Sequence, residues 1–406
     1  MKVNRAPLYS VLLLNSFALF LILPIIFFLI FKSHFFPYLA SAPVHYKWFI
    51  FVAVMIAFPL GQCIGVPFIG SRSDYIRGKP LFLIALLGET LGLFFSFLAL
   101  YYKSLNTFII SRLFTGFFTA NFALCFSYLA SSTNEPSMLK KVMGRATLSI
   151  VAGFMVAIFI ATFFSDANLG NFTDPRIAFL LATFLGLVNT AIILFSKNFL
   201  LSQKVLPHPS ISLLAKLKTI LKQNYILRKN GTALLFLLLC ISAPLSFFSS
   251  IIFGIYTLNK TWLMALLLII GGVWILGFVT NLKYKSFSNN ALVLFFSALS
   301  ALALALSFAP SFTVFIICFA GFQFFASLLS TNLFSQVVMH SPSDARGLCI
   351  GFAQSLGFLA AAIAPILALF LMISPSPVKI SNLFIVSFLF SILGAAYLLF
   401  SKRAIK

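Results

Sequence analysis

The sequence predicts an all-α membrane protein with twelve transmembrane helices in two pseudo-symmetric six-helix bundles. Two observations lead to this fold class. First, 61% of the 406 residues are hydrophobic and the mean hydropathy is +1.09, which is more apolar surface than a water-soluble protein buries. Second, about twelve apolar stretches follow one another, each near the roughly 20 residues that cross a bilayer as a helix.

The predicted helices fall into two groups of six. Almost every connection is short, and the exception is a polar interval with Pro207 and Pro209. We therefore predict an N-terminal bundle over 1–200, a cytoplasmic linker over 201–229 and a C-terminal bundle over 230–406. An amphipathic piece is expected near 213–221. The first stretch, 9–31, has no small-residue cleavage site and is expected to be a retained helix. The helices should begin near Tyr9, Trp48, Leu81, Phe108, Ala146, Ile177, Leu234, Trp262, Ala291, Phe312, Leu348 and Ile380.

The basic residues predict the orientation in the membrane. The net charge is +22, but Lys and Arg lie in short loops between apolar spans. They are therefore interpreted as orientation signals and lipid-headgroup contacts, not as a nucleic-acid surface. With the N-terminus inside, 21 of the 28 basic residues fall on the cytoplasmic side and six on the other. This bias predicts that both termini are cytoplasmic.

The same bias makes the linker a test of topology. A single cysteine placed near Pro207 is expected to resist a membrane-impermeant thiol reagent added to intact cells, because the linker should lie inside. Labelling of that cysteine from outside, with membranes intact, would reverse the predicted orientation.

The two halves of the sequence echo each other. The fifth predicted helix follows Gly144 and carries Gly153, and the eleventh follows Arg346-Gly347 and carries Gly357. A six-plus-six arrangement with matching small-residue helices is typical of duplicated transporters.

Two charged residues lie within the predicted spans. Glu89 is the only deep carboxylate, and an acid inside a membrane is a functional hypothesis by default. It could couple transport to protons, hydrogen-bond within its bundle, or pair with Arg112. Arg112 lies about six residues into the fourth helix. It could face a cavity, or its side chain could extend to the membrane surface.

Several function classes lack their residues. The five cysteines lie in or beside apolar spans without CxxC spacing and are interpreted as small buried hydrophobes. The four histidines lie outside the apolar centres. We expect no metal site, no cofactor and no enzyme activity, since the sequence shows neither a nucleotide-binding loop nor a nucleophile–His–acid set.

The turn GSRSDYIRGKP, after the second helix, resembles the loop 2–3 signature of the major facilitator superfamily. Gly70, Asp74, Lys79 and Pro80 match in place, and Arg77-Gly78 stand in reverse order. The resemblance implies that Gly70, Asp74, Arg77 and Lys79 form a conformational latch on the cytoplasmic side. A carboxylate near a helix N-terminus is stabilised by about 0.3–1 kcal/mol. The alternative is an ordinary polar turn with positive-inside residues.

Two further helices carry the resemblance. Arg112 followed by Gly116 is similar to the fourth-helix signature, whose Arg is linked to proton coupling in the family. Gly144 and Gly153 have the spacing of the fifth-helix antiporter signature. The Gly-Pro pair that the family then expects is replaced by Ala157-Ile158, which weakens the inference of export, whereas Ala364-Pro365 keeps a comparable pair in the second half.

The resemblance to bacterial twelve-helix drug:proton antiporters implies proton-coupled export (multidrug efflux) of a small amphipathic compound by a monomer in the cytoplasmic (inner) membrane of a bacterium. The alternative is uptake of a metabolite or siderophore by the same fold. The implied partners are the small-molecule substrate, protons and membrane lipids. Each polar residue expected in the cavity could instead make an interhelical hydrogen bond. These residues are Asn15, Asn121, Tyr128, Gln323 and Asn332.

Overall fold

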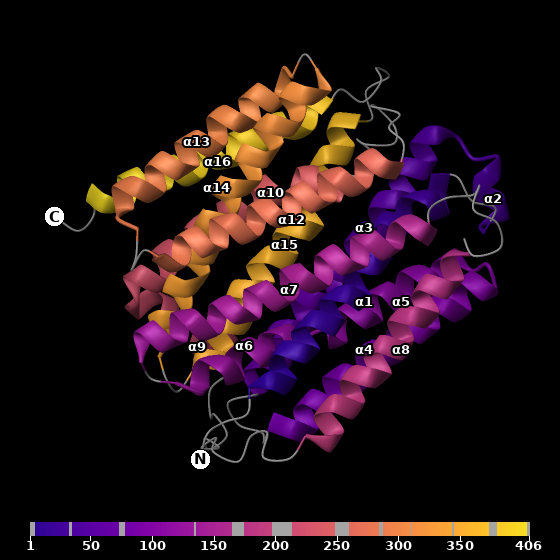
Figure 1. The fold of residues 1–406 in the computed structure, drawn as a ribbon, viewed down its shortest axis with the longest axis horizontal. Helices are drawn as coiled ribbons and strands as arrows, with labels where there is room; N and C mark the ends of the chain where they lie inside the picture. Colours follow the sequence, from indigo (N-terminus) through magenta and orange to yellow (C-terminus); the bar gives the residue numbers. More distant parts are fainter. Residues whose placement is uncertain are drawn as a thin grey trace. The chain divides into compact units, whose positions relative to one another are not determined.

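The structure is a computed structural model. It describes residues 5–31, 35–72, 78–133, 135–164, 174–196, 213–247, 260–283, 287–309, 311–342, 345–372 and 380–403. These residues are mostly helical, and none of them forms a strand (Figure 1). By contacts, the protein divides into two compact units. One comprises Met1–Lys216 and Ser341–Phe358, and the other comprises Leu217–His340 and Leu359–Lys406.

The first unit holds the six predicted N-terminal spans. Its helices are α1 (Ala6–Phe31), α2 (Pro37–Ala40), α3 (Val44–Arg72), α4 (Gly78–Tyr101), α5 (Leu105–Phe118), α6 (Asn121–Ser131), α7 (Pro136–Phe164) and α8 (Pro175–Phe195). Helix α9 (Leu213–Gln223) occupies the place of the expected amphipathic segment and crosses the boundary between the units.

The second unit holds the C-terminal spans. Its helices are α10 (Tyr225–Ser246), α12 (Lys260–Lys283), α13 (Asn289–Ser307), α14 (Phe312–Met339) and α16 (Ile380–Arg403). Helix α15 (Arg346–Met372) begins in the first unit, and its residues from Leu359 onward belong to the second.

Helix pairing repeats between the two units. In the first, α3 packs on α5, α4 on α5 and α8, and α1 on α8. In the second, α12 packs on α14, α13 on α14 and α16, and α10 on α16. Each of these four pairs in the second unit joins helices that stand six spans later in the sequence than a pair in the first. The predicted pseudo-symmetry is therefore present in the packing as well as in the sequence.

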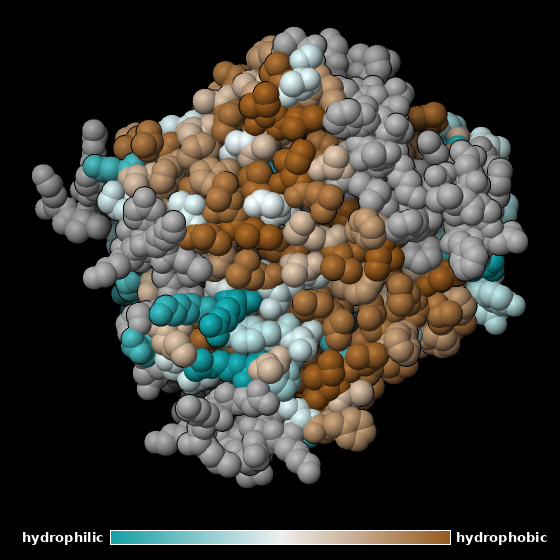
Figure 2. Space-filling model, in the orientation of Figure 1, coloured by the Kyte–Doolittle hydropathy of each residue, from teal (hydrophilic) through white to brown (hydrophobic). Residues whose placement is uncertain are grey.

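The helices present apolar surfaces outward. Within the described residues, 11 segments are long and apolar enough to cross a membrane, and Leu268–Asn281 of α12 is a shorter apolar helix. Large side chains such as Phe184, Leu294 and Ile317 are 60–66% exposed. Apolar residues cover most of the visible described surface in Figure 2. This exposure suits a lipid solvent and would be costly in water.

The fourth span is broken in its middle, which the continuous apolar sequence did not predict. Helix α5 ends at Phe118, Thr119 leaves helical geometry with φ −73° and ψ 40°, and α6 starts at Asn121. The Thr119 hydroxyl donates to the carbonyl of Thr115 at 2.7 Å, so this carbonyl has a hydrogen-bond partner near the break. Interrupted helices at membrane depth are tolerated where protein surrounds the backbone.

Candidate functional site

Glu89 lies at the centre of a buried polar cluster in the first unit. Its side chain on α4 is 2% exposed. The Nδ2 atom of Asn121, the first residue of α6, donates to Glu89 Oε2 at 2.5 Å. The amide oxygen of Asn121 accepts from the backbone N–H of Phe122 at 2.9 Å. Asn121 is thereby held with its nitrogen toward the carboxyl group.

Asn15 of α1 completes the cluster and is also 2% exposed. In one orientation its Nδ2 donates to Asn121 Oδ1 at 3.2 Å, and its oxygen faces Glu89. In the other, its nitrogen donates to Glu89 Oε1 and Oε2 at 3.0 and 3.2 Å, and its oxygen accepts from Asn121 Nδ2 at 3.2 Å. Two residues predicted to line a cavity thus bind the predicted coupling acid.

Glycines on the two helices that flank the break, α3 and α4, allow Glu89 and Asn121 to approach each other. A Cβ atom at Gly65 of α3 would lie 1.8 Å from the carbonyl oxygen of Phe117, and one at Gly88 of α4 would lie 2.3 Å from the Phe118 ring. The end of α5 therefore packs against α3 and α4 so closely that these two positions have no room for a side chain larger than the hydrogen of glycine. Because Gly88 precedes Glu89 and Asn121 follows the break, the same close packing places the carboxyl beside the amide.

Arg112 of α5 is buried without an acidic partner among the described residues. Its side chain is 4% exposed, and its guanidinium carbon lies 4.5 Å from the centre of the Phe58 ring. Its Nε and Nη1 atoms have no hydrogen-bond partner in the described part of the protein. Of the predicted alternatives for Glu89, the structure shows hydrogen bonds within the bundle, and it shows no ion pair between Glu89 and Arg112.

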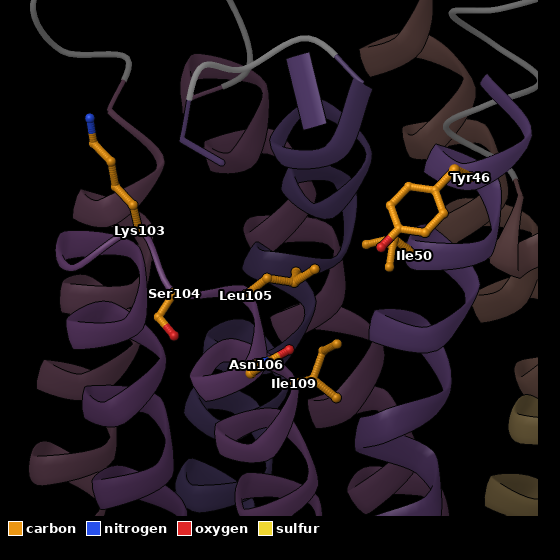
Figure 3. A pocket seen from close by; sticks show the side chains of 7 residues that line it. All are labelled: Tyr46, Ile50, Lys103, Ser104, Leu105, Asn106 and Ile109. Carbon is orange, nitrogen blue, oxygen red and sulfur yellow. The ribbon is translucent and has the colours of Figure 1, made fainter. Parts of the chain in front are cut away.

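A pocket of about 360 Å³ opens between the first turns of α3 and α5. In Figure 3, Leu105 and Ile109 face Tyr46 and Ile50, and the Lys103 side chain points away. The pocket is lined by Tyr46, Ile50, Lys103, Ser104, Leu105, Asn106 and Ile109. Leu105, Ile109 and Arg112 share one face of α5, so Arg112 lies about one helical turn beyond the pocket.

The predicted latch is described in part. Asp74 and Arg77 lie outside the described residues. Within the first unit, the start of α15 packs on the end of α3, because a Cβ atom at Gly70 would lie 3.6 Å from the Cα atom of Gly351. The Nζ atom of Lys79 donates to the carbonyls of Leu194 and Ser196 at 2.7 and 3.4 Å. A cation at the C-terminal end of α8 is favourable.

Two basic residues, Arg346 and Arg5, bind the C-terminal end of α6, and the sequence did not predict either contact. Arg346, the first residue of α15, donates from Nη1 to the carbonyl of Ala130 at 3.2 Å. Arg5 donates to the hydroxyl and the carbonyl of Ser132 at 3.0 and 3.1 Å. Both cations thus neutralise the C-terminal end of α6 within the first unit. A basic residue at a helix start carries no sequence signal for such a distant partner.

The other predicted cavity residues make contacts between helices. The Tyr128 ring packs on Phe82, with centroids 5.5 Å apart. In the second unit, Gln323 accepts from the indole of Trp274 at 2.9 Å, and Asn332 donates to Asn281 at 3.5 Å. These hydrogen bonds join α12 to α14, which was the alternative role for these residues.

The predicted packing residues lie at close contacts or are buried. A Cβ atom at Gly116 would lie 2.1 Å from the carbonyl oxygen of Phe58, and one at Gly153 the same distance from that of Leu13. Gly144 and Pro365 are buried within α7 and α15.

Comparison with known proteins agrees with this architecture. Residues 8–365 match the sequence model of the Major Facilitator Superfamily. No curated protein sequence matches this one. The structure of the human organic anion transporter MFSD10 (TETRAN) is similar, with a TM-score of 0.76, 19% identity and coverage of 97% of this protein and 98% of that one. A variant of the Escherichia coli fucose:proton symporter FucP has a TM-score of 0.71 and 15% identity over 98% of both proteins. The protein therefore belongs to the major facilitator superfamily and is a multi-pass secondary transporter, not an enzyme.

Proposed function

We propose that the protein exports a small amphipathic organic compound by alternating access, driven by protons that bind Glu89. The observation that carries this proposal is the buried Glu89 carboxyl, held by two amides from two other helices. Among the described membrane-spanning helices it is the only acidic side chain. Proton coupling requires a buried group that is neutral in one conformation and ionised in another, and an acid bonded only to neutral amides can serve in both.

Arg112 indicates the charge of the compound. A buried cation with unsatisfied donors is costly, and an acidic group on a ligand would satisfy them. The pocket one turn away is lined by apolar side chains together with Asn106, Ser104 and Lys103. MFSD10, which shares the fold, is an organic anion transporter. We therefore propose an amphipathic anion as the substrate, bound through its acidic group at Arg112.

Transport in everted membrane vesicles tests both proposals. An imposed pH gradient, acidic inside, should drive accumulation of acidic amphipathic dyes from a panel that also includes cationic dyes, antibiotics and siderophores. Uptake, as in the fucose:proton symporter of the same fold, is the second candidate function and predicts accumulation in right-side-out vesicles instead. Accumulation driven by sodium without a pH gradient would contradict proton coupling.

Arg112→Gln is expected to weaken transport of an acidic substrate about tenfold to a hundredfold. A hydrogen bond to a charged group is worth about 1.5–3 kcal/mol, and about 1.4 kcal/mol corresponds to tenfold. Michaelis constants in reconstituted vesicles would measure the loss, with Arg145→Gln, at an exposed position on α7, as a control outside the pocket. Arg112 remains the second proton-coupling candidate. If it serves coupling instead, Arg112→Gln should remove the pH drive for every substrate and leave binding intact.

The cytoplasmic latch is a further proposal. It is supported by the family motif and by the packing of α15 beside Gly70 within the first unit. Asp74→Asn is expected to preserve expression and membrane insertion and to slow transport severely, because the carboxylate should act in conformational cycling and not in folding. Normal turnover of purified Asp74→Asn in reconstituted vesicles would remove the latch assignment.

The predicted location also belongs to the proposal. We place the protein as a monomer in the cytoplasmic membrane of a bacterium, with both termini inside, on the basis of the basic-residue bias and the resemblance to bacterial antiporters.

A further inference from the structure

The cluster around Glu89 fits two complete hydrogen-bond patterns that differ by one proton. When Asn15 turns its nitrogen to Glu89, the carboxyl accepts from Asn15 at 3.0 and 3.2 Å and from Asn121 at 2.5 Å. This pattern suits an ionised carboxylate, which only accepts hydrogen bonds. When Asn15 turns its nitrogen to Asn121 at 3.2 Å, its oxygen faces Glu89. That pattern needs an O–H on Glu89 to donate to this oxygen.

Asn15 and Asn121 are not equivalent in this arrangement. The oxygen of Asn121 is engaged by the N–H of Phe122 at the first turn of α6. Turning the Asn121 amide would break that bond and would place its oxygen against the carboxyl. Asn15 gains a donor and an acceptor partner in either orientation. The amide that can turn is therefore the one on α1.

Within the described residues, no counter-charge reaches the cluster from the elements packed on α4. Arg112 of α5 lies over Phe58. Arg72 of α3 lies over Phe68, and Arg176 of α8 pairs with Asp174 at 2.5 Å. The side-chain hydrogen bonds that Glu89 receives in this part of the protein come from Asn121 and Asn15. The other titratable groups on the described parts of α3 and α6 are His45, Tyr46, Lys47, Cys63, Cys125 and Tyr128.

We propose that Asn15 is a positioning residue that responds to the protonation state of Glu89. Its side-chain amide rotates by half a turn when the carboxyl group gains or loses a proton. The proposal rests on the proposed proton coupling at Glu89 and extends it to α1. Protonation changes Asn15 from a donor to Glu89 into a donor to Asn121. Asn15 joins α1 to both α4 and α6 in either state, and protonation exchanges the helix to which it donates: α4 when the site is ionised, and α6, beyond the break in the fourth span, when the site is neutral.

Infrared difference spectroscopy tests this exchange directly. Purified protein in lipid nanodiscs would be compared at acid and alkaline pH. Acidification should produce a carboxylic-acid C=O band, absent in Glu89→Gln, together with a shift of an asparagine amide C=O band, absent in Asn15→Leu. Asn189→Leu is the matched control, since Asn189 is equally buried on α8 and makes no hydrogen bond through its side-chain amide within the described residues. It should keep both signals.

Transport gives the second measurement. Asn15→Leu should lose pH-driven accumulation, retain downhill exchange and still show the carboxylic-acid band. Asn15→Ser, whose hydroxyl can both donate and accept, should restore part of the drive. A carboxylic-acid band without any asparagine change, or undiminished pH-driven accumulation in Asn15→Leu, would overturn the role of Asn15 while leaving proton coupling standing. Absence of the band in the wild type, with no pH-driven transport, would instead remove the proposed function at Glu89.

Discussion

Glu89→Gln is expected to abolish accumulation driven by a pH gradient and to leave downhill exchange of substrate. A glutamine cannot bind or release the proton. Its oxygen can accept from Asn121 Nδ2, and its nitrogen can donate to the Asn15 oxygen that faces this position. The variant therefore resembles the protonated site and should keep the packing of α1, α4 and α6.

The size of the effect follows from thermodynamics. One pH unit is worth about 1.4 kcal/mol per proton, which supports about a tenfold concentration ratio for one-to-one coupling. Wild-type vesicles should approach that ratio, and Glu89→Gln vesicles should stay near equal concentrations on both sides. Glu135→Gln is the matched control, because it makes the same change at an exposed position at the start of α7. Undiminished pH-driven accumulation in Glu89→Gln would end the assignment of Glu89 as the coupling acid.

The sequence identifies most of the charged and polar residues of this site, but it does not identify their hydrogen-bond partners. Hydropathy is sufficient to place spans, and a charge inside a span stands out at once, as Glu89 and Arg112 do. Which groups they meet depends on the rotation of each helix about its axis. Asn121 lies 32 residues from Glu89, and such a separation carries no periodic signal. The choice between an amide partner and Arg112 therefore depends on the folded structure.

The break in the fourth span shows the same limit at the level of the backbone. The run from Phe114 to Cys125 contains no Pro, and its one Gly, Gly116, lies within α5 and not at the break, so the sequence did not predict the interruption. The break coincides with packing, since Phe117 meets Gly65 and Phe118 meets Gly88. Glycine in a span signals close approach in general. The sequence does not say which helix approaches, and so the two glycines could not be matched to the break.

Polar residues in the second unit were harder to interpret. Gln323 is one of the polar residues that the resemblance places in the cavity, with an interhelical hydrogen bond as the alternative. Its oxygen accepts from Trp274 at 2.9 Å, and the Ser327 hydroxyl donates to the Trp274 carbonyl at 2.9 Å, so both side chains join α14 to α12. A polar residue in a transmembrane helix can make an interhelical hydrogen bond or line a cavity, and its sequence pattern is the same in both cases. Only the partner distinguishes them.

Gly65→Ala is expected to prevent correct packing of the first unit. The added Cβ atom would lie 1.8 Å from the carbonyl oxygen of Phe117 and 2.6 Å from its Cα atom. These are backbone atoms, so no side-chain rotation relieves the overlap, and α3 and α5 must move apart. Overpacking of this kind typically costs about 1–3 kcal/mol and occasionally more. Separation of α3 from α5 would also pull Phe117 and the neighbouring break away from Glu89.

Gly272→Ala is the matched control for this substitution, because a Cβ atom at Gly272 of α12 would meet nothing within 4 Å. Both variants exchange glycine for alanine inside a described apolar helix, where alanine favours helix by up to about 1 kcal/mol. Gly272→Ala should therefore match or exceed the wild type in thermal stability in detergent, whereas Gly65→Ala should unfold at lower temperature and give less monodisperse protein. Equal stability of the two variants would contradict the backbone contact between α3 and α5 on which the position of the Glu89 cluster depends.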